Sequence, residues 1–218
     1  MCWNKKVSMA TFVLAIIGVI YLYNRNNPND RWVALFAATI AMIQLAEYFM
    51  WSDLACGSIN KYASMFALLV LAMEPLMGMV GGIYFSNTKY KNILKYMLFA
   101  YLIFIGYSYF TLYYQKKIPW CGTSLCGEKS NQVSGFVNDK YCNLRWLFNE
   151  HIDSKTGIIW MLFLTIPFLT MTPMYQGIVI FALGFITRAM SSTSTYAAQG
   201  SLWCWLGISV IYFKIIMN

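Results

Sequence analysis

Residues 32–51 read WVALFAATIAMIQLAEYFMW, and residues 62–85 read YASMFALLVLAMEPLMGMVGGIYF. Each stretch is long and apolar enough to cross a bilayer, which takes about 20 residues of helix, yet each contains one carboxylate, Glu47 or Glu74. An ionisable group in a membrane-spanning helix costs about 2.5–3.5 kcal/mol on insertion scales, and such groups usually face a protein interior or a water-filled path. These two carboxylates are therefore the strongest candidate functional residues in the sequence.

The whole chain has the composition of an integral membrane protein. Of its 218 residues, 59% are hydrophobic and only 11% are charged, whereas soluble domains carry about 25% charged residues. The net charge of +8 does not indicate nucleic-acid binding, because the basic residues are scattered between apolar runs and form no stripe with interleaved aromatics.

Apolar runs follow one another along the chain, at residues 7–23, 32–51, 62–85, 92–114, 157–172, 174–190 and 200–217. In lipid, continuous runs of this kind satisfy their backbone only as helices. We therefore predict an all-α fold, a seven-transmembrane helix bundle that forms one integral membrane domain over residues 1–218. The fifth and sixth runs are short and are separated only by Thr172-Pro173, so they form either a tight hairpin or one kinked pair.

Basic residues in the short connections predict the orientation of the bundle. One face carries Arg25, Arg31, Lys89, Lys91, Lys95 and Lys214, and the other carries Lys5, Lys6, Lys61 and Arg188. The face with more basic residues is expected to be cytosolic, which places the N-terminus outside or in a lumen and the C-terminus in the cytosol. Lys214 then lies near the cytosolic edge, where we expect its long side chain to snorkel to water.

Most of the cysteines gather on the predicted outer face, at Cys2, Cys56, Cys121, Cys126 and Cys142. Disulfides persist in oxidising compartments, so these residues are candidates for structural disulfides, whose pairing the sequence leaves open. Residues 115–156 contain three of them and are expected to form an ordered, disulfide-braced loop between the fourth and fifth helices. A redox site is the alternative, although Cys121 and Cys126 lack CxxC spacing. With His151 as the single histidine, no metal site is predicted.

Glu47 shares one face of the second helix with Gln44 and Trp51, about 6 Å below the outer helix end. Arg188, near the outer end of the sixth helix, is expected at a similar depth. Glu47 and Arg188 therefore form either a structural ion pair or part of an ion or substrate vestibule. Further candidates for lining this vestibule begin the last helix, at Gln199 and Trp203, although an interfacial aromatic belt explains the tryptophan equally well.

Glu74 is expected near the middle of the bilayer, about 18 Å along the helix from Tyr62. Burial of a carboxyl group without a charge partner favours its neutral form, which suits proton or cation binding. Pro75 removes a backbone hydrogen bond, so the alternative is that protonated Glu74 only covers the carbonyl exposed there. Small residues follow on nearly the same face and predict close helix approach, at Gly78, Gly81 and Gly82.

Several short motifs occur together along the chain: Met1-Cys2-Trp3 with Ser8, Gln44-x-x-Glu47 up to Trp51, Asn60, Glu74-Pro75-Leu76, Cys121-Gly122, Leu125-Cys126 and Leu144-Arg145-Trp146. As a set they resemble a family of seven-helix membrane proteins of uncharacterised function, with members in microbes, fungi and large viruses. The family more often has Gln before the proline, and this chain lacks the family's usual His before Trp146. The resemblance implies the architecture and identifies residues to examine, but it implies no activity.

The sequence as a whole favours a channel or transporter for protons or small cations, embedded in lipid and without a cofactor or metal. The expected ion- or proton-binding residues are Glu74, Glu47, Gln44 and Arg188, and the expected vestibule residues are Trp203, Gln199 and Trp51. A structural or interaction protein of the membrane is the first alternative. A membrane thiol–disulfide enzyme is the second, and homo-oligomerisation stays open.

Overall fold

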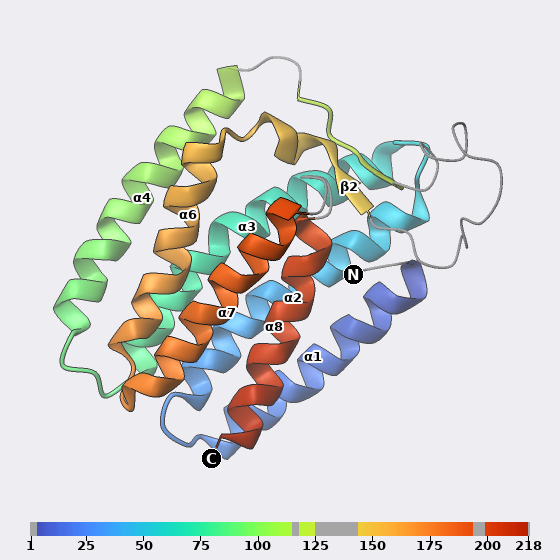
Figure 1. The fold of residues 1–218 in the computed structure, drawn as a ribbon. Helices are drawn as coiled ribbons and strands as arrows, with labels where there is room; N and C mark the ends of the chain where they lie inside the picture. The colour runs from blue at the N-terminus through green and yellow to red at the C-terminus, as the bar shows by residue number, and fades with distance from the viewer. Residues whose placement is uncertain (1–3, 115–117, 125–143, 194–198, 218) are drawn as a thin grey trace.

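The computed structural model describes residues 4–114, 118–124, 144–193 and 199–217, with the side chains of residues 187–193 and 199–207 outside the description. Within this part the chain is mostly helical, with seven α-helices and one pair of short strands (Figure 1). The helices are α1 (Lys5–Arg25), α2 (Asp30–Ser52), α3 (Ser58–Phe85), α4 (Lys91–Tyr114), α6 (Ser154–Thr165), α7 (Met174–Thr193) and α8 (Gln199–Ile216), and 3-10 turns form η1 (Leu147–His151) and η2 (Ile166–Thr170). The prediction of a mostly helical fold is confirmed, and the described residues also contain the short strands β1 (Gly122–Ser124) and β2 (Leu144–Trp146).

In the part of the chain that the structure describes at side-chain level, four helical segments are long and apolar enough to cross a membrane, namely α1, α2, α3 and Lys91–Leu112 of α4. Two further apolar helical segments are shorter, Ser154–Thr170 and Met174–Ile186. The chain is thus compatible with a multi-pass membrane protein. α6 and η2 lead into the cis peptide Thr172–Pro173, after which α7 returns beside them, so the fifth and sixth predicted segments form a hairpin (Figure 1).

α2 is the central helix of the bundle. It packs most extensively against α3 and α1 and also contacts α8, whereas α4 lies at the outer edge against α3 and α6 (Figure 1). We call the end where α2 stops and α3 starts the Ser58 end, and the end where α1 stops and α2 starts the Asp30 end. The small sheet lies at the Ser58 end, where β1 contacts α2 and α3.

Local polar contacts explain where several helices begin and end. Asn4 caps α1 by accepting a hydrogen bond from the Val7 N–H at 3.0 Å, as side-chain oxygens at helix starts commonly do. The turn from α1 to α2 uses Asn26 and Asn29 in the left-handed region, with φ of 53° and 67°, which asparagine tolerates better than most residues. Asp153 caps α6, and hydrogen bonds from Thr156 hold the pKa of its carboxyl below the ordinary value.

Close packing of α2 on α3 depends on glycines that face a tryptophan. A Cβ atom added to Gly81 would lie 2.5 Å from Cδ1 of Trp32, and one added to Gly82 would lie 2.8 Å from its Cζ2. Trp32 is completely buried, stacks on Phe168 of η2 with ring centroids 5.4 Å apart, and donates a hydrogen bond from Nε1 to the Gly78 carbonyl at 2.6 Å. The prediction that small residues permit close helix approach is confirmed for Gly81 and Gly82, whereas a Cβ atom at Gly78 would lie 3.6 Å from Phe168, an ordinary contact distance.

Candidate functional site

Among the described residues, three carboxylates are completely buried, and all of them belong to the central pair α2 and α3. Glu47 lies near the end of α2, Glu74 lies in the second half of α3, and Asp30 begins α2; each has 0% exposure. The sequence pointed to Glu47 and Glu74 because apolar residues surround them. The sequence did not indicate that Asp30 is buried, because Asp30 is next to Arg31 in a polar turn, a pattern typical of a solvent-exposed helix start.

Packing between α2 and α3 gives the relative levels of these carboxylates. Gly78 lies against Phe36, and the two helices are antiparallel, so Glu74 is level with the α2 turn that follows Phe36. At 1.5 Å per residue, this level is about 15 Å from Asp30 and about 10 Å from Glu47 along the helix axis. The three carboxylates are therefore spread along the bundle and do not contact one another directly.

Glu74 lies where Pro75 interrupts the hydrogen bonding of α3. Proline has no N–H, so the carbonyl of Leu71, four residues earlier, lacks its helical donor. The indole Nε1–H of Trp160 in α6 donates to this carbonyl at 2.8 Å. The sequence did not single out Trp160, because nothing in the order of residues indicates that α6 crosses α3 at this turn.

Aromatic donors from other helices also cover further carbonyls of α3. The hydrogen bonds run from Tyr109 to Leu68 at 3.0 Å, from Tyr101 to Ala72 at 2.6 Å and from Trp32 to Gly78 at 2.6 Å. Because the three donors belong to α4 and α2, the helix that carries Glu74 is held on two sides by hydroxyl and indole groups. These contacts fix its position where the proline weakens it.

Replacing Trp160 by Phe is expected to destabilise the protein by about 1–3 kcal/mol, because the Leu71 carbonyl would lose its donor while remaining buried. Thermal unfolding in detergent micelles measures this loss. The matched control is Trp120→Phe, because the Trp120 side chain is only partly buried and its indole makes no hydrogen bond with another described residue. Equal unfolding temperatures for the two variants would contradict the role given to Trp160.

Glu47, at the Ser58 end, has one buried polar neighbour on its own helix and another at about the same level on α1. Gln44, one turn earlier on α2, is buried beside it on the same face. On α1, the Lys5 ammonium lies 4.7 Å from the ring centre of Tyr48, which sets the antiparallel register of the two helices. By this register the buried hydroxyl of Ser8 lies at about the level of Glu47. Glu47 is thus near the helix end, as predicted, but it is excluded from solvent.

Two indole N–H groups at this end find no acceptor among the described residues. Trp51 Nε1 and Trp146 Nε1 are both buried, and neither finds a hydrogen-bond partner within the described part of the chain. Buried polar groups of proteins are almost always satisfied, and ordered water is the usual partner when protein groups are not. The acceptors of these two groups are therefore water or groups outside the described residues.

The other predicted vestibule residues fall beyond what the structure describes at side-chain level. Gln199 begins α8 and Trp203 lies in its first turns, while Arg188 belongs to α7. Their backbones are helical as predicted. Whether Arg188 approaches Glu47 thus stays a prediction.

Asp30 forms the centre of a buried charge network at its end of the bundle. Its carboxylate accepts hydrogen bonds from Arg25 Nε at 2.7 Å and Nη2 at 3.0 Å, and Lys214 Nζ lies 3.4 Å away. The same guanidinium donates to the carbonyls of Lys214 and Ile215 at 3.1 and 3.2 Å. The three charged groups Arg25, Asp30 and Lys214 therefore join α1, α2 and α8.

The expectation that Lys214 snorkels to water is wrong. Its exposure is only 2%, because the buried Asp30 carboxylate provides a counter-charge inside the bundle. The ammonium also donates to Gln176 Oε1 on α7 at 3.2 Å. Asn29 donates to the same oxygen at 3.2 Å and to the Thr172 carbonyl at 2.9 Å, so the network extends to the α7 hairpin.

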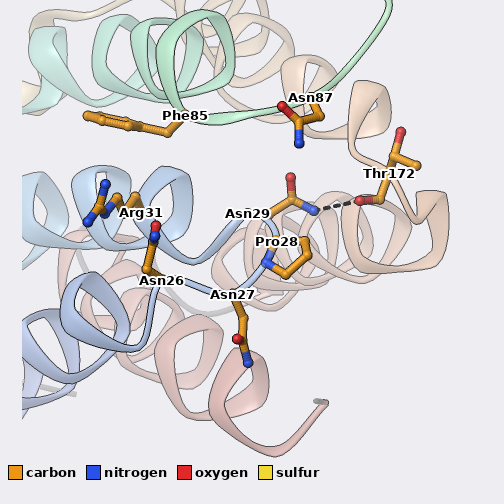
Figure 2. A pocket seen from close by; sticks show the side chains of 8 residues that line it. All are labelled: Asn26, Asn27, Pro28, Asn29, Arg31, Phe85, Asn87 and Thr172. Atoms are coloured by element: carbon orange, nitrogen blue, oxygen red, sulfur yellow. Dashed lines mark hydrogen bonds between the residues drawn. The ribbon is translucent and has the colours of Figure 1, made fainter.

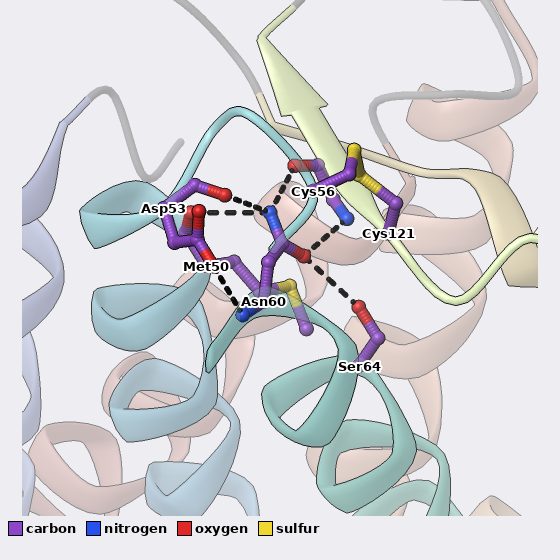
Figure 3. The surroundings of a disulfide bond; sticks show 7 residues. Met50, Asp53, Cys56, Asn60, Ser64 and Cys121 are labelled. Atoms are coloured by element: carbon purple, nitrogen blue, oxygen red, sulfur yellow. Dashed lines mark hydrogen bonds between the residues drawn. A yellow bond between two sulfur atoms is a disulfide. The ribbon is translucent and has the colours of Figure 1, made fainter. Parts of the chain in front are cut away.

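Asn60 organises the Ser58 end (Figure 3). Its Nδ2 donates to the carbonyls of Asp53 and Gly122, each at 2.8 Å, and its Oδ1 accepts from the Gly122 N–H at 2.7 Å and from the Ser64 hydroxyl at 3.3 Å. This buried amide thus uses both its donor and its acceptor to hold β1 against the start of α3. Asn60 and Gly122 appeared in the sequence only as separate motif residues.

A disulfide between Cys56 and Cys121 lies beside this amide, with Cα atoms 5.4 Å apart (Figure 3). It joins the α2–α3 connection to β1, which pairs with β2 in antiparallel register. Two of the five candidate cysteines are thus paired with each other, whereas the predicted bracing of the whole loop stays a prediction. The other candidates, Cys2, Cys126 and Cys142, lie outside the described residues.

Removing the disulfide with Cys56→Ser and Cys121→Ser is expected to destabilise the protein by about 2–4 kcal/mol, the typical effect of losing a native crosslink. The crosslink closes a separation of 65 residues. Thermal unfolding with and without reductant checks this: reductant should lower the unfolding temperature of the parent but not of the double variant. A variant as stable as the parent would contradict a bracing role, and Cys204→Ser controls for loss of a thiol.

Comparisons with other proteins identify no relative. The chain matches no protein-family model, no curated protein and no solved structure. The family resemblance of the short motifs therefore stays a prediction. Among the described residues, no group of three or more His, Cys, Asp and Glu side chains is placed to hold a metal ion.

Proposed function

We propose that this chain is a seven-helix integral membrane protein that passes protons or small cations across a membrane, with Glu74 and Glu47 binding them in transit. The observation that carries this proposal is the complete burial of both carboxylates inside helices long and apolar enough to span a bilayer. An intramembrane ionisable residue is costly and usually marks an ion or proton path. Fold stability alone is better served by an apolar residue at such a position.

The surroundings of the two carboxylates support a relay. Their axial separation of about 10 Å corresponds to about three to four hydrogen bonds of 2.7–3.2 Å in series. One buried polar side chain, Gln44, lies within this interval. The indole N–H groups of Trp51 and Trp146 are suited to binding water at the Ser58 end. Gln44 serves in this proposal as a polar contact next to Glu47.

In the proposed arrangement α6 with η2, α7 and α8 complete the seven spans, and the Cys56–Cys121 disulfide lies on the outer face. The Asp30 end, which carries Arg25, Arg31, Lys89 and Lys91, is then cytosolic by the distribution of basic residues. Arg188, Gln199 and Trp203 are proposed to line the outer entrance. The N-terminus is outside or lumenal.

The test is flux into liposomes that contain the purified protein. Vesicles loaded with a pH-sensitive dye and given a pH gradient should lose the gradient faster than protein-free vesicles, and parallel assays with potassium or sodium gradients separate protons from cations. Parent protein without any flux above the protein-free background overturns the proposal.

A structural membrane protein is the second candidate, and the Asp30 network favours it. Arg25, Asp30 and Lys214 show that this chain uses buried charges to join helices. If Glu47 and Glu74 do the same, their replacement by glutamine lowers stability and the protein conducts nothing. The flux and unfolding measurements therefore separate the two functions.

A further inference from the structure

A pocket of about 270 Å³ opens at the Asp30 end of the bundle (Figure 2). It is formed by three segments far apart in sequence: the α1–α2 turn with the start of α2, the end of α3, and the turn before α7. Its lining consists of Asn26, Asn27, Pro28, Asn29, Arg31, Phe85, Asn87 and Thr172. The function proposed above uses none of these residues.

The wall of this pocket is rich in hydrogen-bond donors. The amide groups of Asn26, Asn27 and Asn87 make no hydrogen bond to other described residues, and Figure 2 shows Asn87 facing Asn29 across the opening. Arg31 uses Nε to donate to the Tyr23 carbonyl at 3.4 Å and stacks over the Tyr23 ring at 4.9 Å. Its two Nη groups make no hydrogen bond within the described structure. A guanidinium held in this way presents a planar pair of donors that suits phosphate.

The charge around the pocket is positive. No carboxylate lines it, and the nearby Asp30 is buried and already paired with Arg25 and Lys214. Lys89 follows Asn87 in the connection to α4 and adds charge at the same end. An anionic ligand is therefore favoured over a neutral or cationic one.

The position of the pocket indicates how such an anion reaches it. Exposed aromatic side chains surround this end of the bundle, including Tyr23, Tyr84, Phe85 and Tyr90. Tyrosines concentrate at the level of lipid headgroups in membrane proteins, where the ring is partly apolar and the hydroxyl is wet. Phe85 is both a wall of the pocket and 39% exposed, so a ligand seated there can extend an acyl chain along α3.

We propose that this pocket binds the phosphate-bearing headgroup of an anionic phospholipid, with Arg31 contacting the phosphate and the asparagine amides contacting its polar substituent. The inference rests on the chain being embedded in a membrane but not on transport. If alkaline carbonate extracts the protein from membranes, the protein is not inserted in the bilayer, and both the transport proposal and this one are wrong. If the protein is inserted in the membrane but shows no preference for an anionic lipid, only the proposal of a lipid-binding pocket is wrong.

The experiment is native mass spectrometry of the detergent-solubilised full chain, titrated with phosphatidylglycerol or phosphatidylcholine. One phosphatidylglycerol is expected to bind preferentially, and Arg31→Gln is expected to weaken its binding about tenfold, because a hydrogen bond to a charged group contributes about 1.5–3 kcal/mol. Asn87→Asp keeps the shape of an exposed side chain and places a negative charge in the wall. It is expected to weaken binding as well, which provides a second variant if Arg31→Gln folds poorly.

The matched control is Lys91→Gln, which removes one positive charge at the same end but does not line the pocket. Its binding should stay within about twofold of the parent, since exposed charges contribute little at this distance. Equal binding of the two lipids, or equal losses in Arg31→Gln and Lys91→Gln, overturns the proposal. Competition by soluble glycerophosphate or inorganic phosphate at concentrations as low as those of the lipid would also overturn it, because it would show a site for free phosphate.

Discussion

Glu74→Gln is expected to reduce flux through the reconstituted protein to the level of protein-free liposomes. Glutamine has nearly the size and hydrogen-bonding reach of glutamate, but it can neither release a proton nor carry the negative charge that attracts a cation. Glu74 lies in the middle of α3, about 15 Å and about 10 Å in axial distance from the buried carboxylates on either side. No other described carboxylate can replace it at this level.

Two further variants make this result specific. Glu47→Gln is expected to lower flux as well, because it removes the next group toward the Ser58 end. Glu150→Gln is the matched control: it also removes one carboxylate, but from an exposed position in η1 where Glu150 pairs with Arg145. Full flux in Glu74→Gln, with the parent active, would exclude this carboxylate as a binding group in transit. A similar loss in Glu150→Gln would indicate a defect of folding or reconstitution.

Asp30→Asn is expected to destabilise the protein by about 3–5 kcal/mol, the usual effect of removing one partner from a buried ion pair. The substitution keeps the shape of the side chain but leaves Arg25 and Lys214 facing each other without a counter-charge. It also weakens the hydrogen bonds that join α1 to α8 through α2. Thermal or denaturant unfolding in detergent micelles measures the loss.

The chain contains its own control for this prediction. Arg145 and Glu150 form an ion pair with an Nε–Oε1 distance of 2.6 Å, close to the 2.7 Å of Arg25 and Asp30, but their side chains are 27% and 37% exposed against 16% and 0%. Exposed pairs contribute at most about 1 kcal/mol, so Glu150→Gln should change stability little. Equal effects of the two substitutions would contradict the importance of burial at Asp30.

A double variant separates charge repulsion from lost hydrogen bonds. Lys214→Met removes one of the two cations that Asp30 neutralises, so adding it to Asp30→Asn should cost less than the sum of the two single changes. Additive losses would mean that the ammonium and the carboxylate act independently. The 3.4 Å separation of their charged atoms argues against such independence.

The helices could be predicted from the sequence because each one is a continuous apolar run. The run at residues 32–51 became α2 (Asp30–Ser52), and the run at residues 62–85 became α3, which begins four residues earlier at Ser58. The added residues at the helix ends are mostly polar, so a search for apolar runs does not include them. The burial of Glu47 and Glu74 was predictable for the same reason, since a charge inside an apolar run has no route to solvent.

The partners of buried groups could not be predicted, because they come from distant segments. Trp160 covers the carbonyl left free by Pro75 across 89 residues of sequence. Asn60 meets Gly122 across 62 residues. The hydrophobic pattern determines which face of a helix is buried, but it does not determine which side chain of another helix meets it. The pairing of Cys56 with Cys121 was left open for this reason, and so was the inward turn of Lys214.

The contact between α1 and α8 has a consequence for biosynthesis. Arg25 donates to a carbonyl that lies 190 residues farther along the chain, so the ribosome must make every intervening helix before this bond can form. Until then Arg25 and Asp30 lack their third partner at the membrane surface. A chain that stops before α8 therefore lacks the Lys214 ammonium and the two carbonyl groups to which Arg25 donates in the complete bundle.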